Sequence, residues 1–394
     1  MTNPEGRLPN IRIYADRSHY KTEQRGFLTS ILRPFWKDFP FSDDERVRTY
    51  GGQVRQYTVV DSPELADVGV LPMHWVHYYQ TGTLPQAMAF VESARSLGKP
   101  VITENSGDYS VPVPSDDLYL FQANCYKSRR RPFEYALPVF IHDLLHELGE
   151  PAISIRPWEK TPLIGFCGQA YDPWLRRAIK PFSIAYRNLK FHCNLSYYQP
   201  HALYPPTFLR SKALSILEQS GEVKTDFVKR THYRGGTEKS KEELRQEFLE
   251  NIRDTDYTVC VRGTGNFSQR IYEVLALGRI PIFIDTDSIL PYDEIVDWRD
   301  YCVWIEPHEL ERLPQKVAAF HNALTPGEFA DLQWRCRKFW EDRLSFAGFF
   351  THFSEHLQLG RYGAGVFGKK TRRVGSIPAT EAVAGSSLNM ENPL

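Results

Sequence analysis

A short stretch in the second half of the chain combines cationic side chains, glycines and a carboxylate at spacings that suit an anionic ligand. Arg262, Gly263 and Gly265 directly follow an aromatic and β-branched run, and Arg270 and Glu273 come soon after them. Glycines let the backbone approach a ligand closely, and arginines can donate paired hydrogen bonds to phosphate oxygens. The stretch therefore predicts a site for a negatively charged, phosphate-bearing ligand.

Two strands and a helix must position these residues. Tyr257 to Val261 and Ile280 to Ile284 are apolar runs too short for helices, which is typical of buried parallel strands. Between them, apolar residues from Ile271 to Gly278 recur at helical spacing and predict a crossover helix that packs on the sheet. Asn266 and Gln269 resemble a capping box, which would start the helix beside the glycines and turn its free N–H groups toward an anion.

The same stretch resembles the C-terminal half of the exostosin family of glycosyltransferases. That family carries an Arg-Gly-x-Gly turn, a Ser-x-Arg-x-x-Glu helix, a Gly-x-Ile-Pro strand and a Leu-Pro-Phe segment. The counterparts here, in the same order, are Arg262 to Gly265, Ser268 to Glu273, Gly278 to Pro281 and Leu290 to Tyr292. Thr58 to Pro72 and Lys160 to Gly168 resemble earlier segments of the family less specifically. On local pattern alone, an ordinary strand-helix-strand unit with a surface pair of Arg270 and Glu273 stays an alternative.

The resemblance implies an α/β fold of the GT-B type, in which two Rossmann-like domains face each other across a cleft. It implies that Arg262, Arg270 and the helix N-terminus neutralise a diphosphate, and that Glu273 accepts hydrogen bonds from ribose hydroxyls. Gly168 would let a loop approach the phosphates or the acceptor, with a simple turn glycine as the alternative. The nucleotide-sugar-binding residues expected on this basis are Gly168, Arg262, Gly263, Gly265, Ser268, Arg270 and Glu273.

The implied activity is that of an inverting glycosyltransferase, a hexosyl- or pentosyl-transferase. It would move a sugar from a nucleotide sugar, expected to be UDP-linked, to a glycan or glycoconjugate acceptor in polysaccharide biosynthesis. A general base for the acceptor hydroxyl should lie at a strand end of the first domain. Asp16 and Asp108 are the favoured candidates, and the others are His19, His74, His77 and Glu104. A non-catalytic nucleotide- or glycan-binding protein of the same fold is the alternative function.

No metal or other cofactor is expected, because fixed arginines and a helix dipole can stabilise the leaving group. Asp285-Thr286-Asp287 matches an Asp-x-Asp metal motif of another transferase fold, but it follows a strand where the exostosin pattern has only an acidic loop. The basic cluster from Lys127 to Arg131 favours a solvated loop, with a grip on an anionic acceptor as the alternative.

Composition supports a two-domain protein without a nucleic-acid partner. The 394 residues include 48 basic and 48 acidic side chains, so no global field favours nucleic acid. Six scattered cysteines without a CxxC pair indicate free thiols in a reducing compartment. The polar amino terminus and the lack of a long apolar run predict a cytoplasmic, bacterial-type protein with no integral membrane segment.

The expected domains are residues 1–155 on the acceptor side, 156–345 for the nucleotide sugar, a closing helix at 346–360 and a disordered tail at 361–394. Strands are expected at Ile11 to Ala15, Val68 to Leu71 and Pro100 to Thr103, and possible further strands at Lys190 to Asn194 and Thr225 to Val228. The proline-containing segment Gly149 to Pro162 is the expected linker.

Overall fold

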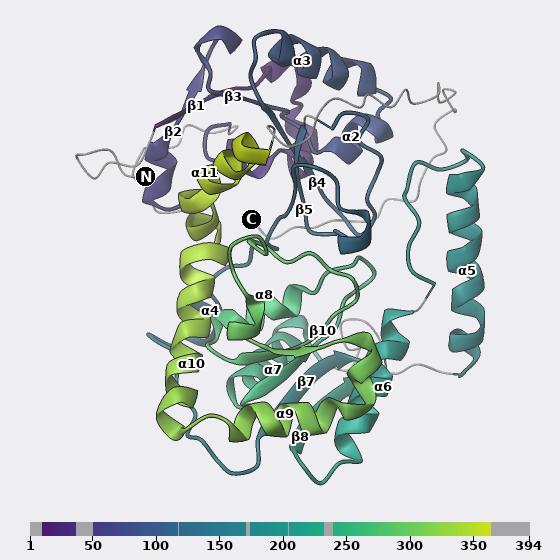
Figure 1. Ribbon diagram of the computed structural model, residues 1–394, viewed down its shortest axis with the longest axis vertical. Coiled ribbons are helices and arrows are strands. Elements are labelled where there is room, and N and C mark those ends of the chain that lie inside the picture. The colour runs from purple at the N-terminus through teal and green to yellow at the C-terminus, as the bar shows by residue number, and fades with distance from the viewer. Residues whose placement is uncertain are drawn as a thin grey trace.

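Two parallel β-sheets, one in each half of the chain, organise the protein (Figure 1). The computed structural model describes residues 10–36, 50–116, 118–170, 174–203, 205–231 and 239–363. The first sheet has six strands in the order β2-β1-β3-β4-β5-β6, and the second has five in the order β11-β10-β9-β7-β8. Every described pair of neighbouring strands is parallel. The expected architecture of two α/β domains is confirmed.

The first domain is built from short buried strands with helices and 3₁₀ turns between them. Its strands are β1 (Ile11–Tyr14), β2 (Tyr57–Val60), β3 (Val68–Val70), β4 (Val101–Asn105), β5 (Leu118–Gln122) and β6 (Glu134–Ala136). Its helices are α2 (Trp75–Gln80), α3 (Leu84–Ser96) and α4 (Leu144–Leu148). Helix α3 buries Ala87, Phe90, Val91 and Ala94, the apolar face that its spacing produces.

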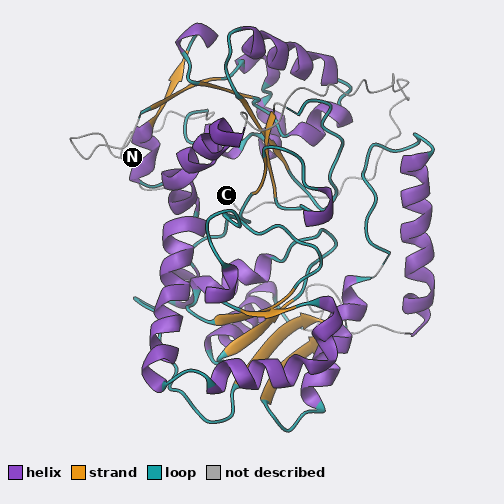
Figure 2. Cartoon of the chain, in the orientation of Figure 1, coloured by secondary structure: helices purple, strands orange, loops and turns teal. Residues whose placement is uncertain are grey.

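The second domain has the predicted strand-helix-strand rhythm, with helices around its sheet (Figure 2). Its strands are β7 (Leu163–Gln169), β8 (Lys224–Arg230), β9 (Tyr257–Cys260), β10 (Ile280–Ile284) and β11 (Val303–Ile305). Its helices are α5 (Trp174–His192), α6 (Pro206–Glu218), α7 (Lys241–Arg253), α8 (Gln269–Ala276), α9 (Leu313–Asn322) and α10 (Pro326–Phe339). Among the described residues, no helix is both long and apolar enough to cross a lipid bilayer.

The last helix, α11 (Phe346–Gly363), follows a π-helical turn and returns to the first domain (Figure 1). The Tyr57 hydroxyl donates to the Phe350 carbonyl, and the Tyr135 hydroxyl donates to the His356 carbonyl at 3.4 Å. The Tyr292 hydroxyl of the second domain donates to Phe349 on the same helix at 3.2 Å. Helix α11 therefore ties the two domains together.

Some expected elements differ from the structure. The strand expected at Lys190 to Asn194 is wrong, because Lys190 still belongs to helix α5. Gly149 to Pro162 does connect the domains, but Ile153 and Ser154 within it pack against the second domain. Most of the expected tail lies beyond residue 363 and so outside the described residues.

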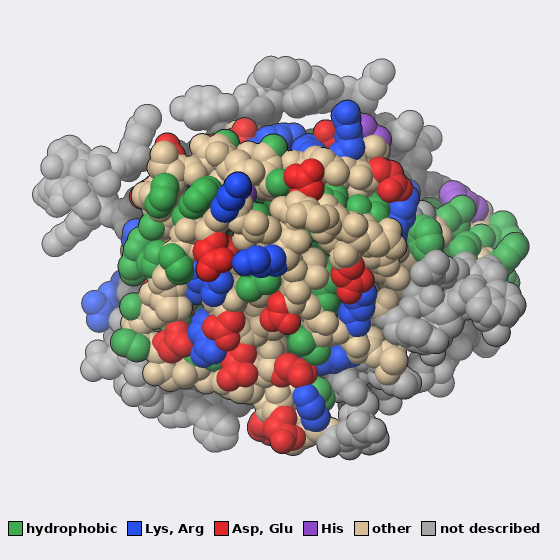
Figure 3. Space-filling view, turned by 90° about the horizontal axis from the view of Figure 1, so that it is seen from below, with side chains coloured by type: hydrophobic (Ala, Val, Ile, Leu, Met, Phe, Trp, Pro, Cys, Tyr) green, Lys and Arg blue, Asp and Glu red, His purple; other side chains and the backbone are tan. Residues whose placement is uncertain are grey.

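Charges of both signs alternate over the face of the molecule seen in Figure 3. This mixture agrees with the equal numbers of acidic and basic residues in the whole chain. Any ligand charge must therefore be met by a local arrangement of side chains.

Candidate functional site

Three arginines lie at the carboxyl-terminal edge of the second sheet. Arg262 follows β9, and its backbone carbonyl accepts a hydrogen bond from Arg210 Nη2 on α6 at 3.3 Å. Arg210 Nη1 donates to the carbonyl of Gln169, the last residue of β7, at 2.7 Å. Arg270, in the first turn of α8, donates to Cys167 of the same strand at 2.6 Å. The fold thus places Arg262 directly after β9 and Arg270 against the end of β7, and it adds Arg210, whose helix the sequence did not reveal.

Arg270 packs against aromatic rings beneath these strand ends. Its guanidinium carbon lies 4.2 Å from the ring centroid of Phe166 and 5.5 Å from that of Phe248. Burial lowers the pKa of Arg270, although the group stays charged at neutral pH. Gly168 has a φ of 147°, and a Cβ atom placed there would lie only 2.8 Å from Arg270 Nη2. Gly168 therefore makes room for the Arg270 side chain.

Glu273 lies on the same helix, is 5% exposed and takes part in an ion pair. Its Oε1 accepts hydrogen bonds from Arg245 Nη1 of α7 at 3.0 Å and from Gln269 Nε2 at 3.2 Å. Arg245 also contacts Glu147 at 2.8 Å. The alternative of a surface pair with Arg270 is therefore wrong, because Glu273 is inside the protein and pairs with a different arginine.

The glycine turn docks on the first domain. The Gly265 N–H donates to Asp108 Oδ1 at 3.2 Å, while the Gly263 N–H closes the turn on the Phe267 carbonyl at 2.8 Å. A Cβ atom placed at Gly265 would lie 2.5 Å from the Phe267 ring and 3.1 Å from Asp108 Cα. Gly265 thus permits close approach of the two domains.

The predicted capping box of Asn266 and Gln269 is wrong. Asn266 contacts the first domain instead, since its N–H donates to Asn124 Oδ1 at 2.6 Å and its Nδ2 to the Cys125 carbonyl at 2.8 Å. The N-cap of α8 is Ser268, whose side chain makes no capping hydrogen bond. The first turn of α8 therefore has N–H groups without a side-chain cap, as anion binding requires.

Of the candidate bases, Asp108 is the one that the structure brings to this turn. Burial raises the pKa of Asp108, and the hydrogen bond from Gly265 only partly offsets that rise. Asp16 instead caps its own 3₁₀ turn, accepting a hydrogen bond from the Ser18 N–H at 2.9 Å. Burial raises the pKa of Asp16, but hydrogen bonds from Ser18 outweigh it and lower the pKa.

The remaining candidates lie inside the first domain. Glu104 is buried and accepts hydrogen bonds from the N–H and hydroxyl of Ser30 at 3.0 and 2.8 Å. His74 Nε2 lies 3.2 Å from the same carboxylate. His19 and His77 are also buried, and burial lowers the pKa of both, that of His77 to about 4. These contacts bind the residues into the core of the first domain.

A buried histidine that the sequence analysis missed lies where the domains meet. The ring centroid of His201 is 4.5 Å from that of Tyr109. Arg187 of α5 also packs on the Tyr109 ring, with its guanidinium carbon 4.5 Å from the ring centroid. Burial, together with the charges of Arg187, Arg262 and Arg129, lowers the pKa of His201 to about 4. The junction is therefore cationic around a neutral imidazole. A lone His between proline and alanine carries no sequence signal for this.

The Asp-x-Asp segment joins the domains through the basic cluster. Asp285 accepts a hydrogen bond from Lys127 Nζ at 2.7 Å, and Asp287 accepts one from the Ser128 N–H at 3.0 Å. Arg130 pairs with Asp293 at 2.8 Å and also contacts Glu294. Residues 127–130 are exposed, as expected for a solvated basic loop, and Lys127 and Arg130 also make ion pairs between the domains.

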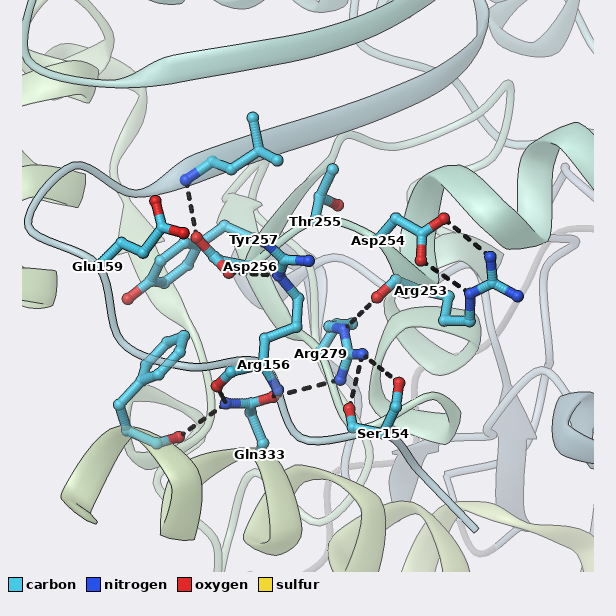
Figure 4. A network of polar contacts seen from close by, with 12 residues as sticks. Ser154, Arg156, Glu159, Arg253, Asp254, Thr255, Asp256, Tyr257, Arg279 and Gln333 are labelled. Carbon is cyan, nitrogen blue, oxygen red and sulfur yellow. Dashed lines mark hydrogen bonds and ion pairs between the residues drawn. The ribbon is translucent and has the colours of Figure 1, made fainter. Parts of the chain in front are cut away.

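Arg279, in the second half of the exostosin-like motif, takes part in a network of polar contacts (Figure 4). Gly278 ends α8 with a φ of 64°. Arg279 is fully buried and donates to the Arg253 and Ser154 carbonyls at 2.8 Å and to Gln333 Oε1 at 3.2 Å. Burial lowers the pKa of Arg279 to about 10. This network holds the interdomain segment, including Ser154, against the second domain.

Two parallel α/β sheets, one in each half of the chain, meet at the junction described above. Residues 207–320 match the exostosin GT47 domain. The match lies within the second domain, so this part of the chain is similar to the exostosin GT47 glycosyltransferase domain. The matched span contains Arg210, Arg262, Arg270 and Glu273.

Individual relatives are distant. The rice (Oryza sativa subsp. japonica) protein named "Probable glucuronosyltransferase GUT1" is 25% identical over 68 residues, which are 17% of this chain and 16% of that protein. Anabaena HepE, solved in complex with UDP, is 11% identical with a TM-score of 0.35, covering 89% of this chain and 100% of its own. An O-GlcNAc transferase of Thermobaculum terrenum is 13% identical with a TM-score of 0.36, and the match covers 91% of this chain and 69% of that one.

Proposed function

We propose that the protein transfers a sugar from a UDP-linked nucleotide sugar to a hydroxyl of a glycan or glycoconjugate, with inversion at the anomeric carbon. The observation that carries the proposal is the contact between Asp108 and Gly265. It brings a carboxylate of one domain to the turn of the exostosin GT47 domain that also carries Arg262. The proposed base would thus lie beside the proposed anion site.

The donor would bind along the edge of the second sheet. Arg262 and Arg270, together with the N-terminus of α8, would neutralise the diphosphate. Gly263, Gly265 and Ser268 shape the turn that leads into this helix, and Gly168 accommodates Arg270. Arg245 and Gln269 both contact Glu273 Oε1, so we assign Oε2 to the ribose hydroxyls.

The chemical step would use Asp108 as the general base. The acceptor hydroxyl oxygen attacks the anomeric carbon, its proton passes to the Asp108 carboxylate, and the bond from that carbon to the diphosphate oxygen breaks. The leaving diphosphate gains negative charge, which the arginines stabilise without a metal ion. The raised pKa of Asp108 supports this role, because a more basic carboxylate accepts a proton more readily.

Calorimetric titration with UDP and with GDP tests the donor site. We expect Arg262→Lys and Glu273→Gln to weaken UDP binding by about tenfold or more, because each removes a bidentate or charged contact. Arg299→Lys, on an exposed turn after β10, is the matched control and should leave the affinity unchanged. Gln is preferred to Ala at position 273, since truncation would leave Arg245 without this partner. If the wild-type protein binds neither nucleotide, the proposal fails.

Turnover separates an enzyme from a binding protein of the same fold. A screen of UDP sugars should reveal slow hydrolysis or transfer by the wild-type protein in the presence of EDTA. Nucleotide binding without turnover on any sugar and acceptor would favour the non-catalytic alternative. Loss of turnover in EDTA, restored by Mg²⁺ or Mn²⁺, would contradict metal-free catalysis.

A further inference from the structure

Helix α5 carries a stripe of exposed apolar side chains. Ile179, Phe182, Tyr186 and Leu189 follow one another at steps of three, four and three residues, so they share one face of the helix. Their exposed fractions are 57%, 76%, 62% and 58%. We call these four residues the α5 stripe. Scattered exposed apolar residues are normal on a soluble protein, whereas a contiguous stripe marks an interaction surface.

The opposite face of α5 contacts the domain junction. The α5 stripe therefore points away from that junction. Ile184 on that face is buried. Arg187 contacts the Tyr109 hydroxyl, and Asn188 exchanges two hydrogen bonds with the backbone of His201, at 2.8 and 3.0 Å. Figure 1 shows α5 standing at the edge of the molecule, and hydrophobic side chains gather at the same edge in Figure 3.

The segment of the chain that carries the stripe is basic. No aspartate or glutamate occurs between Asp172 and Glu218, although the whole chain has equal numbers of acidic and basic residues. Lys190 borders the stripe, with its Nζ 4.8 Å from the ring centroid of Tyr186. The lysines and arginines of the helix are Arg176, Arg177, Lys180, Arg187 and Lys190.

We propose that the α5 stripe docks this protein on the surface of an anionic lipid bilayer. A helix with an aromatic and aliphatic face flanked by basic residues lies in the membrane interface, with its apolar side chains below the headgroups and its cations at the lipid phosphates. The lack of acidic residues in this segment favours an anionic lipid surface over a second copy of the helix. Two copies of α5 placed face to face would bring lysines and arginines together without a carboxylate from the helix to oppose them.

Vesicle flotation of the full-length protein tests the proposal. Vesicles of phosphatidylcholine are compared with vesicles that also contain about 30 mol% phosphatidylglycerol, which supplies the anionic surface. We expect the wild-type protein to float with the anionic vesicles and much less with the neutral ones. Phe182→Ser combined with Leu189→Ser should lower the partition coefficient by about tenfold or more. Lys180→Gln and Lys190→Gln should each lower it by roughly fivefold.

Matched changes on another helix control for general effects of charge and hydrophobicity. Trp334, on α10, is 49% exposed, and Lys338 is an exposed lysine of the same helix. We expect Trp334→Ser and Lys338→Gln to bind vesicles as the wild-type protein does. Circular dichroism and UDP titration should show that the α5 variants stay folded and retain the nucleotide site.

Three outcomes would overturn the proposal. The first is that the wild-type protein fails to float with anionic vesicles. The second is that the α10 variants lose as much binding as the α5 variants. The third is a dimer, seen by sedimentation without lipid, that Phe182→Ser with Leu189→Ser abolishes, because the stripe would then belong to contact with a second copy.

Discussion

The carboxylate of Asp108 in the first domain accepts a hydrogen bond from the backbone N–H of Gly265 in the second, at 3.2 Å. These residues are far apart in the sequence, and each follows a strand of its own sheet. The contact fixes how a carboxylate of one domain faces the cationic edge of the other. It is therefore the point at which domain docking and the proposed chemistry can be tested together.

Replacing Asp108 should abolish turnover while leaving nucleotide binding intact. Asp108→Asn keeps a side-chain oxygen that can accept from the Gly265 N–H but removes the basic carboxylate. We expect kcat to fall by about 10²- to 10⁴-fold, with little change in the UDP dissociation constant. Asp16→Asn should keep nearly full kcat, because Asp16 caps a turn within its own domain. If Asp16→Asn lost activity while Asp108→Asn kept it, the general base would be Asp16 instead.

The pH profile should report the same carboxylate. Burial raises the pKa of Asp108, so its basic form is present only above a pH higher than the usual aspartate pKa of about 4. We expect kcat/KM to rise with pH through this raised pKa and to level off above it. The residual kcat/KM of Asp108→Asn should not show this rise on the acid side of the pH profile. If kcat/KM of the variant rose with pH as it does in the wild-type protein, Asp108 would not be the group that titrates.

The two glycines of the turn should differ in their tolerance of a methyl group. A Cβ atom at Gly265 would lie 2.5 Å from the Phe267 ring, whereas at Gly263 the nearest atom is the Phe267 carbonyl oxygen at 3.9 Å. We expect Gly265→Ala to lower the free energy of unfolding by about 1–3 kcal/mol, because of overpacking at the domain contact. Gly263→Ala should cost clearly less. Urea unfolding of both variants measures the difference, and equal costs would contradict it.

The buried Arg279 should stabilise the protein strongly without any role in chemistry. Its guanidinium satisfies the backbone carbonyls of Ser154 and Arg253 and the side chain of Gln333. We expect Arg279→Met to lower the free energy of unfolding by about 3 kcal/mol or more, since it leaves several buried acceptors unpaired. Arg299→Met, at a side chain 60% exposed, should cost no more than about 0.5 kcal/mol. Chemical denaturation checks both variants, and similar costs would count against the network.

Mild acid should destabilise the protein through the buried His356. Burial lowers its pKa to about 4 in the folded state, against about 6.5 in the unfolded chain. As the pH falls from about 6.5 to 4, the unfolded state binds a proton that the folded state does not, so up to about 3 kcal/mol of stability is lost. His356→Phe should flatten this dependence of unfolding free energy on pH. The same change at the exposed His308 should leave the slope as it is, and a slope unaltered in both variants would exclude His356.

The sequence by itself determined the local architecture of the second domain. The strands at Tyr257 and Ile280 and the helix between them follow from short apolar runs and from spacing of three and four residues, which are local properties. The positions of Arg262 and Arg270 near the strand ends follow from the same pattern, because a residue that succeeds a strand lies at the edge of its sheet.

Only the tertiary structure decided which side chains meet across the two domains. Asp108 with Gly265, and Lys127 with Asp285, are partners because the sheets dock through α11 and the intervening loops, and no local pattern encodes that docking. The buried place of His201 has the same origin. The spacing of apolar residues along the sequence indicates which face of one helix or strand is buried. Contacts between distant segments depend instead on how whole domains pack.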